Sequence, residues 1–253
     1  LLICGMHVHV GIEDDELRID MMNQMSYFLP HLLALSCSSP FWEGDNTGLK
    51  SYRLTVFDAL PRTGIPERFA SYAEYERHIR IMVEAGLIED SSRIWWDLRP
   101  SMRFPTLETR VMDVCTRLDD TVAIAAMLVC LMRMLYRLRS HNQRWRIYTP
   151  MLIRENRWRA MRYSFDEGLI DLAKGEVVPF DVLLDELLDL VAEDAEALDC
   201  QPEIEHIRTI TARGTSAHRQ INVFEESKAF GANTEDALKN VVDTLIEDTA
   251  EGL

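Results

Sequence analysis

Residues 5–10 read Gly-Met-His-Val-His-Val, and this stretch determines how the fold is interpreted. Successive side chains of a β-strand project to opposite faces, so His7 and His9 would share one face and the apolar residues the other. The stretch therefore predicts a half-buried strand, over residues 2–11, that presents two imidazoles on its polar face. Two half-exposed structural histidines explain the same pattern when it stands alone.

The same alternation recurs at residues 106–111, which read Thr-Leu-Glu-Thr-Arg-Val within a strand that we predict over 106–113. Glu108 and Arg110 would project from one face, and the leucine and valine from the other. A carboxylate binds hard cations such as Mg²⁺, and a guanidinium makes paired hydrogen bonds to carboxylates and phosphates. One strand therefore offers a metal ligand beside an anion-binding group.

A third run, residues 94–101, reads Ile-Trp-Trp-Asp-Leu-Arg-Pro-Ser and contains a strand that we predict over 93–99. Asp97 and Arg99 would share a face, whereas tryptophans at this spacing are more often part of a core. Polar pairs from three strands predict a sheet with one face in the core and one polar face. Such a face suits Mg²⁺ and phosphate groups, because oxygen ligands hold the cation and arginines compensate phosphate charge.

The rest of the chain is predicted to be mainly helical. Helices are expected over residues 14–35 with a kink at Pro30, and over 72–85, 119–140, 149–163, 179–198, 202–213, 216–228 and 234–249. Residues 36–53 are rich in Ser, Gly, Pro, Asp and Asn, so they are predicted to form a long ordered loop that returns at Tyr52–Phe57. Strands early in the chain and helices late predict an α+β fold.

Charge divides the chain after Tyr163. Residues 1–163 carry 21 basic and 20 acidic side chains, and residues 164–253 carry 6 basic and 22 acidic ones. We expect residues 1–163 to hold the catalytic sheet with its packing helices, and residues 164–253 to form an acidic helical region packed on the same domain. The acidic excess disfavours nucleic acid and anionic membranes as partners. The apolar run 121–132 is too short to span a bilayer of about 30 Å, and it predicts a buried helix.

The five cysteines are an odd number without a closely spaced pair, so neither a disulfide framework nor a zinc knuckle is predicted. Inert buried thiols in a reducing compartment are the simple interpretation, and we expect a cytoplasmic protein. The chain begins in a strand pattern without an initiator Met, which predicts that an N-terminal part is missing.

Six separated motifs carry a resemblance to a known family. They are GMHVHVG, LPHLLALSCSSPFWEGDNTGLKSYR, LPRTGIP, IWWDLRPS, PTLETRVMD and NRWRAMRY. In order and spacing they resemble the carboxylate–amine ligases of the glutamate–cysteine ligase type 2 family, densely to about Tyr163 and loosely beyond it. The resemblance implies a glutamine synthetase-like fold, in which the concave face of a curved antiparallel sheet binds ATP and Mg²⁺. It also implies ATP-dependent joining of a carboxylate to an amine, with glutamate and cysteine as the expected pair.

The resemblance further implies roles for individual residues. As metal ligands it implies His7 and Glu108. As groups that hold substrate or the transferred phosphate it implies Arg53, Arg99 and Arg110. As residues of the nucleotide site it implies His9, Arg99, Asn156 and Arg162.

Two other function classes fit the same residues. A His-x-His strand followed by scattered carboxylates also serves metal-dependent hydrolases. A non-catalytic nucleotide-binding scaffold would keep the sheet without turnover. The expected partners are small-molecule amino-acid substrates, and the family together with the abundance of twofold dimers favours a homodimer.

Overall fold

In the computed structural model, which describes residues 3–251, three antiparallel strands form the sheet that carries the polar residues. In sheet order these strands are β1 (Val8–Gly11), β7 (Thr106–Thr109) and β6 (Leu98–Pro100). The register places Glu108 of β7 opposite His9 of β1 and also opposite Arg99 of β6. Directly opposed residues share a face, so these three side chains meet on one side of the sheet.

The other face of this sheet is apolar. Leu98 and Leu107 have no exposed surface, and they belong to the same core as the helices that follow β1. Helix α1 (Asp15–Met25) contacts β6 and β7, and helix α5 (Leu118–Ser140) contacts β1. The sheet therefore has one core face and one polar face, as the alternation along its strands predicts.

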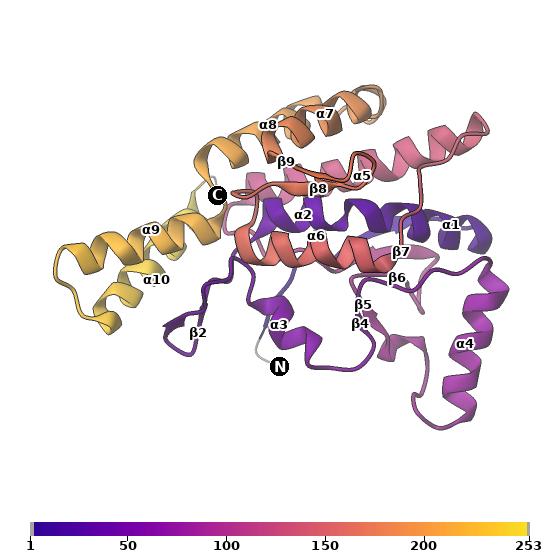
Figure 1. Ribbon diagram of the computed structural model, residues 1–253, viewed down its shortest axis with the longest axis horizontal. Helices are drawn as coiled ribbons and strands as arrows, with labels where there is room; N and C mark the ends of the chain where they lie inside the picture. Colours follow the sequence, from indigo (N-terminus) through magenta and orange to yellow (C-terminus); the bar gives the residue numbers. More distant parts are fainter. Residues whose placement is uncertain (1–2, 252–253) are drawn as a thin grey trace.

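The helices make up most of the molecule, and Figure 1 shows α1 and α2 running through its middle with α6 beside them. The remaining helices are α2 (Leu29–Ser36), α3 (Arg53–Asp58), α4 (Tyr72–Glu84), α6 (Pro150–Tyr163), α7 (Phe180–Ala197), α8 (Gln201–Arg213), α9 (Ser216–Ala229) and α10 (Thr234–Ala250). Every helix expected from the sequence is present, with ends within one residue of the expected ones. The α+β expectation is confirmed as a mixture of helices and small sheets.

Local sequence explains where several helices begin. The Asp14 carboxylate accepts the Leu17 N–H at 2.6 Å at the start of α1, and the Ser71 hydroxyl accepts the Glu74 N–H at 3.1 Å at the start of α4. Pro30 lies in the first turn of α2, where its missing N–H leaves no helical bond unmade. A single 3₁₀ turn, Ser26–Phe28, joins α1 to α2, so the α-helix is interrupted before Pro30 and not at Pro30 itself.

The expected strand over 93–99 is wrong as a single element. A 3₁₀ turn, Ser91–Arg93, comes first, and β5 (Trp95–Trp96) then pairs in parallel with β4 (Thr63–Gly64). The chain changes its pairing partner at Asp97. The Asp97 N–H donates to the Gly64 carbonyl at 2.8 Å, and the Asp97 carbonyl accepts the backbone N–H of Arg110 at 2.7 Å. Only β6 therefore joins the polar sheet.

Other strand expectations also need correction. The strand expected over 2–11 is regular only from Val8, with an isolated bridge from Gly5 to Asp113, and Leu2 lies outside the described residues. The loop over 36–53 contains a small hairpin, β2 (Phe41–Trp42) with β3 (Asp45–Asn46). The segment that follows the loop forms helix α3. A second hairpin, β8 (Leu169–Asp171) with β9 (Glu176–Val178), was not expected at all. These strands have only two or three residues each, too few to give a periodic signal.

Helix α5 is long and apolar enough to cross a membrane by length and composition. Half of the 18-residue stretch of α5 with the highest mean hydropathy is buried inside the fold. The helix packs there against α1, α2, α7 and α8. The core helix of a globular domain passes the same test of length and composition, and this burial agrees with the buried helix expected at residues 121–132.

The acidic part of the chain is joined to the rest by buried polar contacts. Asp194 of α7 has no exposed surface, and it accepts hydrogen bonds from Arg133 at 2.6 Å and Arg137 at 2.7 Å, both on α5. Gln220 of α9 donates to the carbonyl of Ser38 at 2.8 Å. Figure 1 shows α9 and α10 packed against each other as a helical hairpin that extends from one end of the molecule.

Candidate functional site

Glu108 is the centre of a cluster of charged side chains on the polar face of the sheet. Its Oε2 accepts a hydrogen bond from Arg99 Nε at 2.9 Å, and its Oε1 accepts one from Arg110 Nη1. The Glu108 residue is 4% exposed, whereas the side chains of Arg99 and Arg110 keep 15% and 13% of their surface in contact with solvent. The carboxylate is thus buried between two partly hydrated guanidinium groups.

Two imidazoles form the open side of this cluster. His7 Nδ1 lies 3.3 Å from Glu108 Oε1, and His9 Nε2 lies 3.9 Å from the same oxygen. Their side chains are 35% and 40% exposed, respectively. His9 Nδ1 also lies 2.9 Å from the Thr106 hydroxyl on the adjacent strand, which orients the ring.

The electrostatic environment keeps Glu108 ionised. Burial by itself would raise the pKa of Glu108, but the hydrogen bonds from His7 and Arg99 and the charges of Arg99 and Arg110 outweigh burial. The pKa of Glu108 therefore lies well below its ordinary value. One carboxylate and two guanidinium groups give Glu108, Arg99 and Arg110 together an excess of one positive charge.

Neighbouring segments hold the two arginines in place. Arg99 Nη1 donates to the Ser92 carbonyl at 3.0 Å and also to the carbonyl of Ile94. The Arg110 guanidinium lies 5.7 Å from the Phe57 ring centroid on α3, within the range of a cation–π contact. Arg110 Nε is buried and has no hydrogen-bond partner among the described residues. The solvent-exposed parts of Arg99 and Arg110, beside the two half-exposed imidazoles, suit an anionic ligand that brings its own acceptor oxygens.

Magnesium fits these residues poorly. Glu108 is the single carboxylate of the cluster, and guanidinium groups already occupy both of its oxygens. Within residues 3–251, no group of three or more His, Cys, Asp or Glu side chains is arranged to hold a metal ion. The metal roles expected for His7 and Glu108 therefore stay predictions, and the described residues do not complete a Mg²⁺ site by themselves.

Arg53 lies directly behind the cluster. Its guanidinium donates to the Arg110 carbonyl at 2.9 Å and the Val111 carbonyl at 3.3 Å, and it lies 3.6 Å from the carboxylate of Asp113. A Cβ at residue 5 would lie 2.1 Å from Arg53 Nη2, so Gly5 leaves the space that this side chain needs. The observed contacts of Arg53 brace the segment directly after β7, which carries Arg110, and its expected contact with a substrate carboxylate stays a prediction.

The structure does not bring the other expected residues to the cluster. Asn156 is buried on α6, where it donates to the Ile170 carbonyl at 2.8 Å and accepts the Ile170 N–H at 2.7 Å, which fixes β8 to the helix. Arg162 donates to the carbonyl of Gly48. These contacts are structural, and the nucleotide-site roles of Asn156 and Arg162 stay predictions.

Asp97 corrects the expectation of a shared polar face with Arg99. Its carboxylate is 1% exposed, and it accepts a hydrogen bond from Arg157 Nε at 2.5 Å. Arg157 also binds Asp58 through Nη1 at 2.7 Å and Nη2 at 2.9 Å. Because the strand changes its partner at Asp97, this carboxylate forms a buried ion pair with Arg157 of α6 and does not join the Glu108 cluster.

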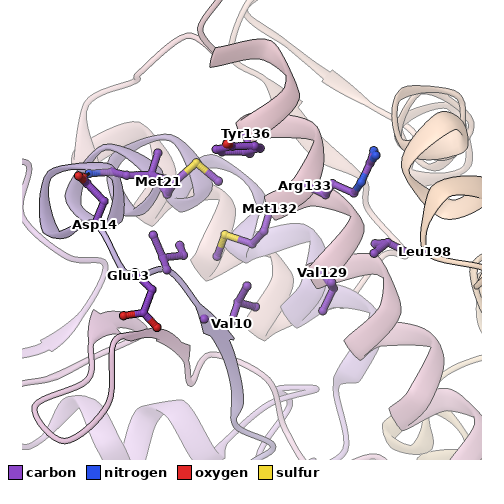
Figure 2. Close-up of a pocket in the computed structure, with 12 residues that line it drawn as sticks. Val10, Glu13, Asp14, Met21, Val129, Met132, Arg133, Tyr136 and Leu198 are labelled. Carbon is purple, nitrogen blue, oxygen red and sulfur yellow. Dashed lines mark hydrogen bonds between the residues drawn. The ribbon is translucent and has the colours of Figure 1, made fainter. Parts of the chain in front are cut away.

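An apolar cavity of about 470 Å³ lies beside β1 and differs in chemistry from the cluster. Figure 2 shows Val10 of β1, Met21 of α1, and Val129 and Met132 of α5 around it. Arg133, which also lines the cavity, is already paired with Asp194. Glu13, Asp14 and Tyr136 line it as well, and the Asp14 carboxylate accepts the Leu17 N–H at the start of α1. The cavity thus lacks the paired guanidinium groups that the Glu108 cluster brings together.

Two residues that contact the cluster were not predicted from the sequence. Thr106 contacts His9, and Phe57 contacts Arg110. Thr106 carried a usable signal, because it precedes Glu108 by two positions in a strand and so shares its face. Phe57 carried none, since its position depends on how the helix after the long loop folds back.

The comparisons with known proteins agree on one family. Residues 1–243 match the model of a family described as glutamate–cysteine ligase family 2. Three relatives carry the provisional name glutamate–cysteine ligase 2: one from Rhodospirillum rubrum is 63% identical over 253 residues, one from Ruegeria pomeroyi 58% over 248 residues, and one from Jannaschia sp. 54% over 248 residues. The alignments cover 98 to 100% of this chain, which spans only 64 to 65% of the length of these relatives.

A solved structure supports the fold. The crystal structure of a glutamate–cysteine ligase from Francisella tularensis, in complex with AMP, matches with a TM-score of 0.58 and 12% sequence identity. The match covers 94% of this chain and 59% of that protein. At this identity the likeness concerns the arrangement of helices and strands.

Proposed function

The chain belongs to the glutamate–cysteine ligase family 2, and from this membership we propose that the protein is an ATP-dependent ligase that joins a carboxylate to an amine. The observation that carries the proposal is the convergence of Arg99, Arg110 and Glu108 beside two half-exposed histidines. We propose further that β1, β7 and β6 belong to a curved glutamine synthetase-like sheet, whose concave face is the polar one.

The reaction has two balanced steps. A carboxylate oxygen of the first substrate attacks the γ-phosphorus of ATP, the bond to ADP breaks, and an acyl phosphate forms. The nitrogen of the amine then attacks the acyl carbon and loses a proton, and inorganic phosphate leaves with the original carboxylate oxygen. In this proposal Arg99 and Arg110 compensate the negative charge of the phosphoryl group during its transfer.

Glu108 positions the two arginines. Its carboxylate binds Arg99 and Arg110 together, so both guanidinium groups are held on the face where His7 and His9 are open to solvent. Preorganised donors stabilise a transition state without the cost of reorienting at the moment of reaction. Magnesium is expected to bind together with ATP. The described residues of the cluster offer it one carboxylate, Glu108, so no step is assigned to the metal ion.

Glutamate, through its γ-carboxylate, and cysteine are the proposed substrate pair. The names of the relatives support this choice. A metal-dependent hydrolase is less well supported, because the matching family model and the named relatives are described as glutamate–cysteine ligases.

The test is coupled release of ADP by the purified protein, with ATP, Mg²⁺, glutamate and cysteine each omitted in turn. The proposal predicts that ADP forms only in the complete mixture, or at a small fraction of that rate without cysteine. A hydrolase that does not use ATP, or a nucleotide-binding scaffold, would release no ADP in any of these mixtures. ADP release that is independent of both amino acids would contradict the ligase assignment and indicate an ATPase.

A further inference from the structure

Two of the cysteines, far apart in the sequence, lie side by side in the fold. Cys130 is in the middle of α5, and Cys200 is the residue directly before α8. Their sulfur atoms are 3.5 Å apart although 70 positions separate them in the chain. Helices α5 and α8 pack against each other, so the pair is held together by the core of the protein.

The two thiols differ in access. Cys130 has no exposed surface, whereas Cys200 is partly exposed at the turn between α7 and α8. Burial raises the pKa of Cys130 to about 12, and the adjacent Cys200 thiol acts in the same direction. Cys130 is therefore protonated near neutral pH, and a reagent from solution meets Cys200 first.

A tight turn between α7 and α8 carries Cys200. Asp199 adopts a positive φ of 52°, a conformation that non-glycine residues adopt mostly in turns. The Cys200 N–H donates to the Ala195 carbonyl at 3.0 Å, which leaves its side chain free to approach α5. A disulfide needs its two sulfurs about 2.05 Å apart, so closure of the pair requires a shift of roughly 1.5 Å.

We propose that Cys130 and Cys200 are an oxidation site, at which a low-molecular-weight disulfide converts the two thiols into an intramolecular disulfide that ties α5 to the start of α8. This site does not depend on the proposed ligase function. It also revises the expectation that all the cysteines are inert.

The oxidation proceeds by two thiol–disulfide exchanges. The Cys200 thiolate attacks one sulfur of the small disulfide, which releases one small thiolate and leaves Cys200 in a mixed disulfide. Cys130 then attacks the Cys200 sulfur, its proton passes to the second departing thiolate, and the Cys130–Cys200 bond forms. Two protein thiols are oxidised, and one small disulfide is reduced to two thiols.

Peptide mapping tests the proposal with glutathione disulfide as the probe. The protein is incubated with increasing ratios of oxidised to reduced glutathione, remaining thiols are blocked, and the digest is examined by mass spectrometry. The expected product is a peptide pair linked through Cys130 and Cys200. A Cys4→Ser variant is the matched control, because Cys4 is exposed and lies outside the pair, and it should give the same linked peptide.

The single variants separate the two steps. Cys200→Ser should leave Cys130 unmodified, and Cys130→Ala should stop at a glutathione adduct on Cys200. In the wild type, oxidation should raise Tm by roughly 5–10 °C, because the bond closes a long loop, and neither variant should show this rise. Wild-type protein in which Cys200 carries only glutathione, or is linked to another cysteine, would overturn the proposal.

Discussion

Replacing Glu108 by Gln should lower the free energy of unfolding by about 2–3 kcal/mol at neutral pH. The substitution keeps the shape of the side chain but removes the negative charge between Arg99 and Arg110. A hydrogen bond to a charged group contributes about 1.5–3 kcal/mol. The amide oxygen of Gln can still accept from one of the two arginines, so about one such hydrogen bond is lost. Removing one partner of a fully buried ion pair costs about 3–5 kcal/mol, and the partial exposure of both arginines reduces that cost through hydration.

The pH dependence of this loss follows from the depressed pKa of Glu108. The ionised carboxylate stabilises the folded state at every pH above the unfolded value of about 4.3. Below that value the stabilisation falls by about 1.4 kcal/mol per pH unit, until the folded protein also takes up the proton. The difference between wild type and Glu108→Gln should therefore be constant above about pH 5 and shrink as the pH falls further.

Urea unfolding followed by tryptophan fluorescence at several pH values between about 3.5 and 7 measures this difference. Glu155→Gln is the matched control, because Glu155 is exposed on α6, and it should change the free energy of unfolding by less than about 0.5 kcal/mol. If Glu108→Gln is no more destabilising than Glu155→Gln, or if its effect is the same at all pH values, the electrostatic account of the cluster is wrong.

Arg110→Lys should reduce kcat/KM of the proposed ligation by roughly 10- to 100-fold, because an ammonium cannot replace paired guanidinium contacts; steady-state kinetics with normal turnover would reassign Arg110 to structure. Arg157→Met should lower the free energy of unfolding by about 3–5 kcal/mol, because buried Asp97 loses its partner. Adding Asp97→Asn should restore part of that stability in urea unfolding, and a further loss would contradict the ion-pair argument. Gly168→Ala should cost about 3 kcal/mol and Gly175→Ala about 1 kcal/mol. Both glycines have positive φ, but only a Cβ at Gly168 would lie 2.1 Å from a carbonyl oxygen of β9, so equal Tm values for the two variants would refute this reasoning.

Alternation within strands predicted most of the cluster correctly. His7, His9, Glu108 and Arg110 each follow a period of two in residues 5–10 and 106–111. The structure brings them together on β1 and β7 and on the residues directly next to these strands. Period-two alternation is a local property of the chain, so it can be read before any long-range contact is known. The juxtaposition is confirmed in this way, while the chemical role of each residue stays a prediction.

The sequence failed where long-range pairing decides the local structure. Asp97 follows the same period as Arg99, but a parallel pairing with β4 interrupts the strand and gives its carboxylate to Arg157. Asn156 and Arg162 were placed by resemblance alone, and their polar atoms are used to fix β8 and the loop at Gly48. No spacing rule indicates which carbonyl a helix side chain will meet.

Transfer of oxygen from the carboxylate substrate to phosphate tests the central claim most directly. Glutamate labelled with ¹⁸O in its γ-carboxylate is supplied to the protein with ATP, Mg²⁺ and cysteine, and the inorganic phosphate is examined by mass spectrometry. The proposed acyl phosphate predicts one ¹⁸O atom in each phosphate released, because that phosphate leaves with an oxygen of the original carboxylate. Phosphate released during amide formation without ¹⁸O would contradict the account.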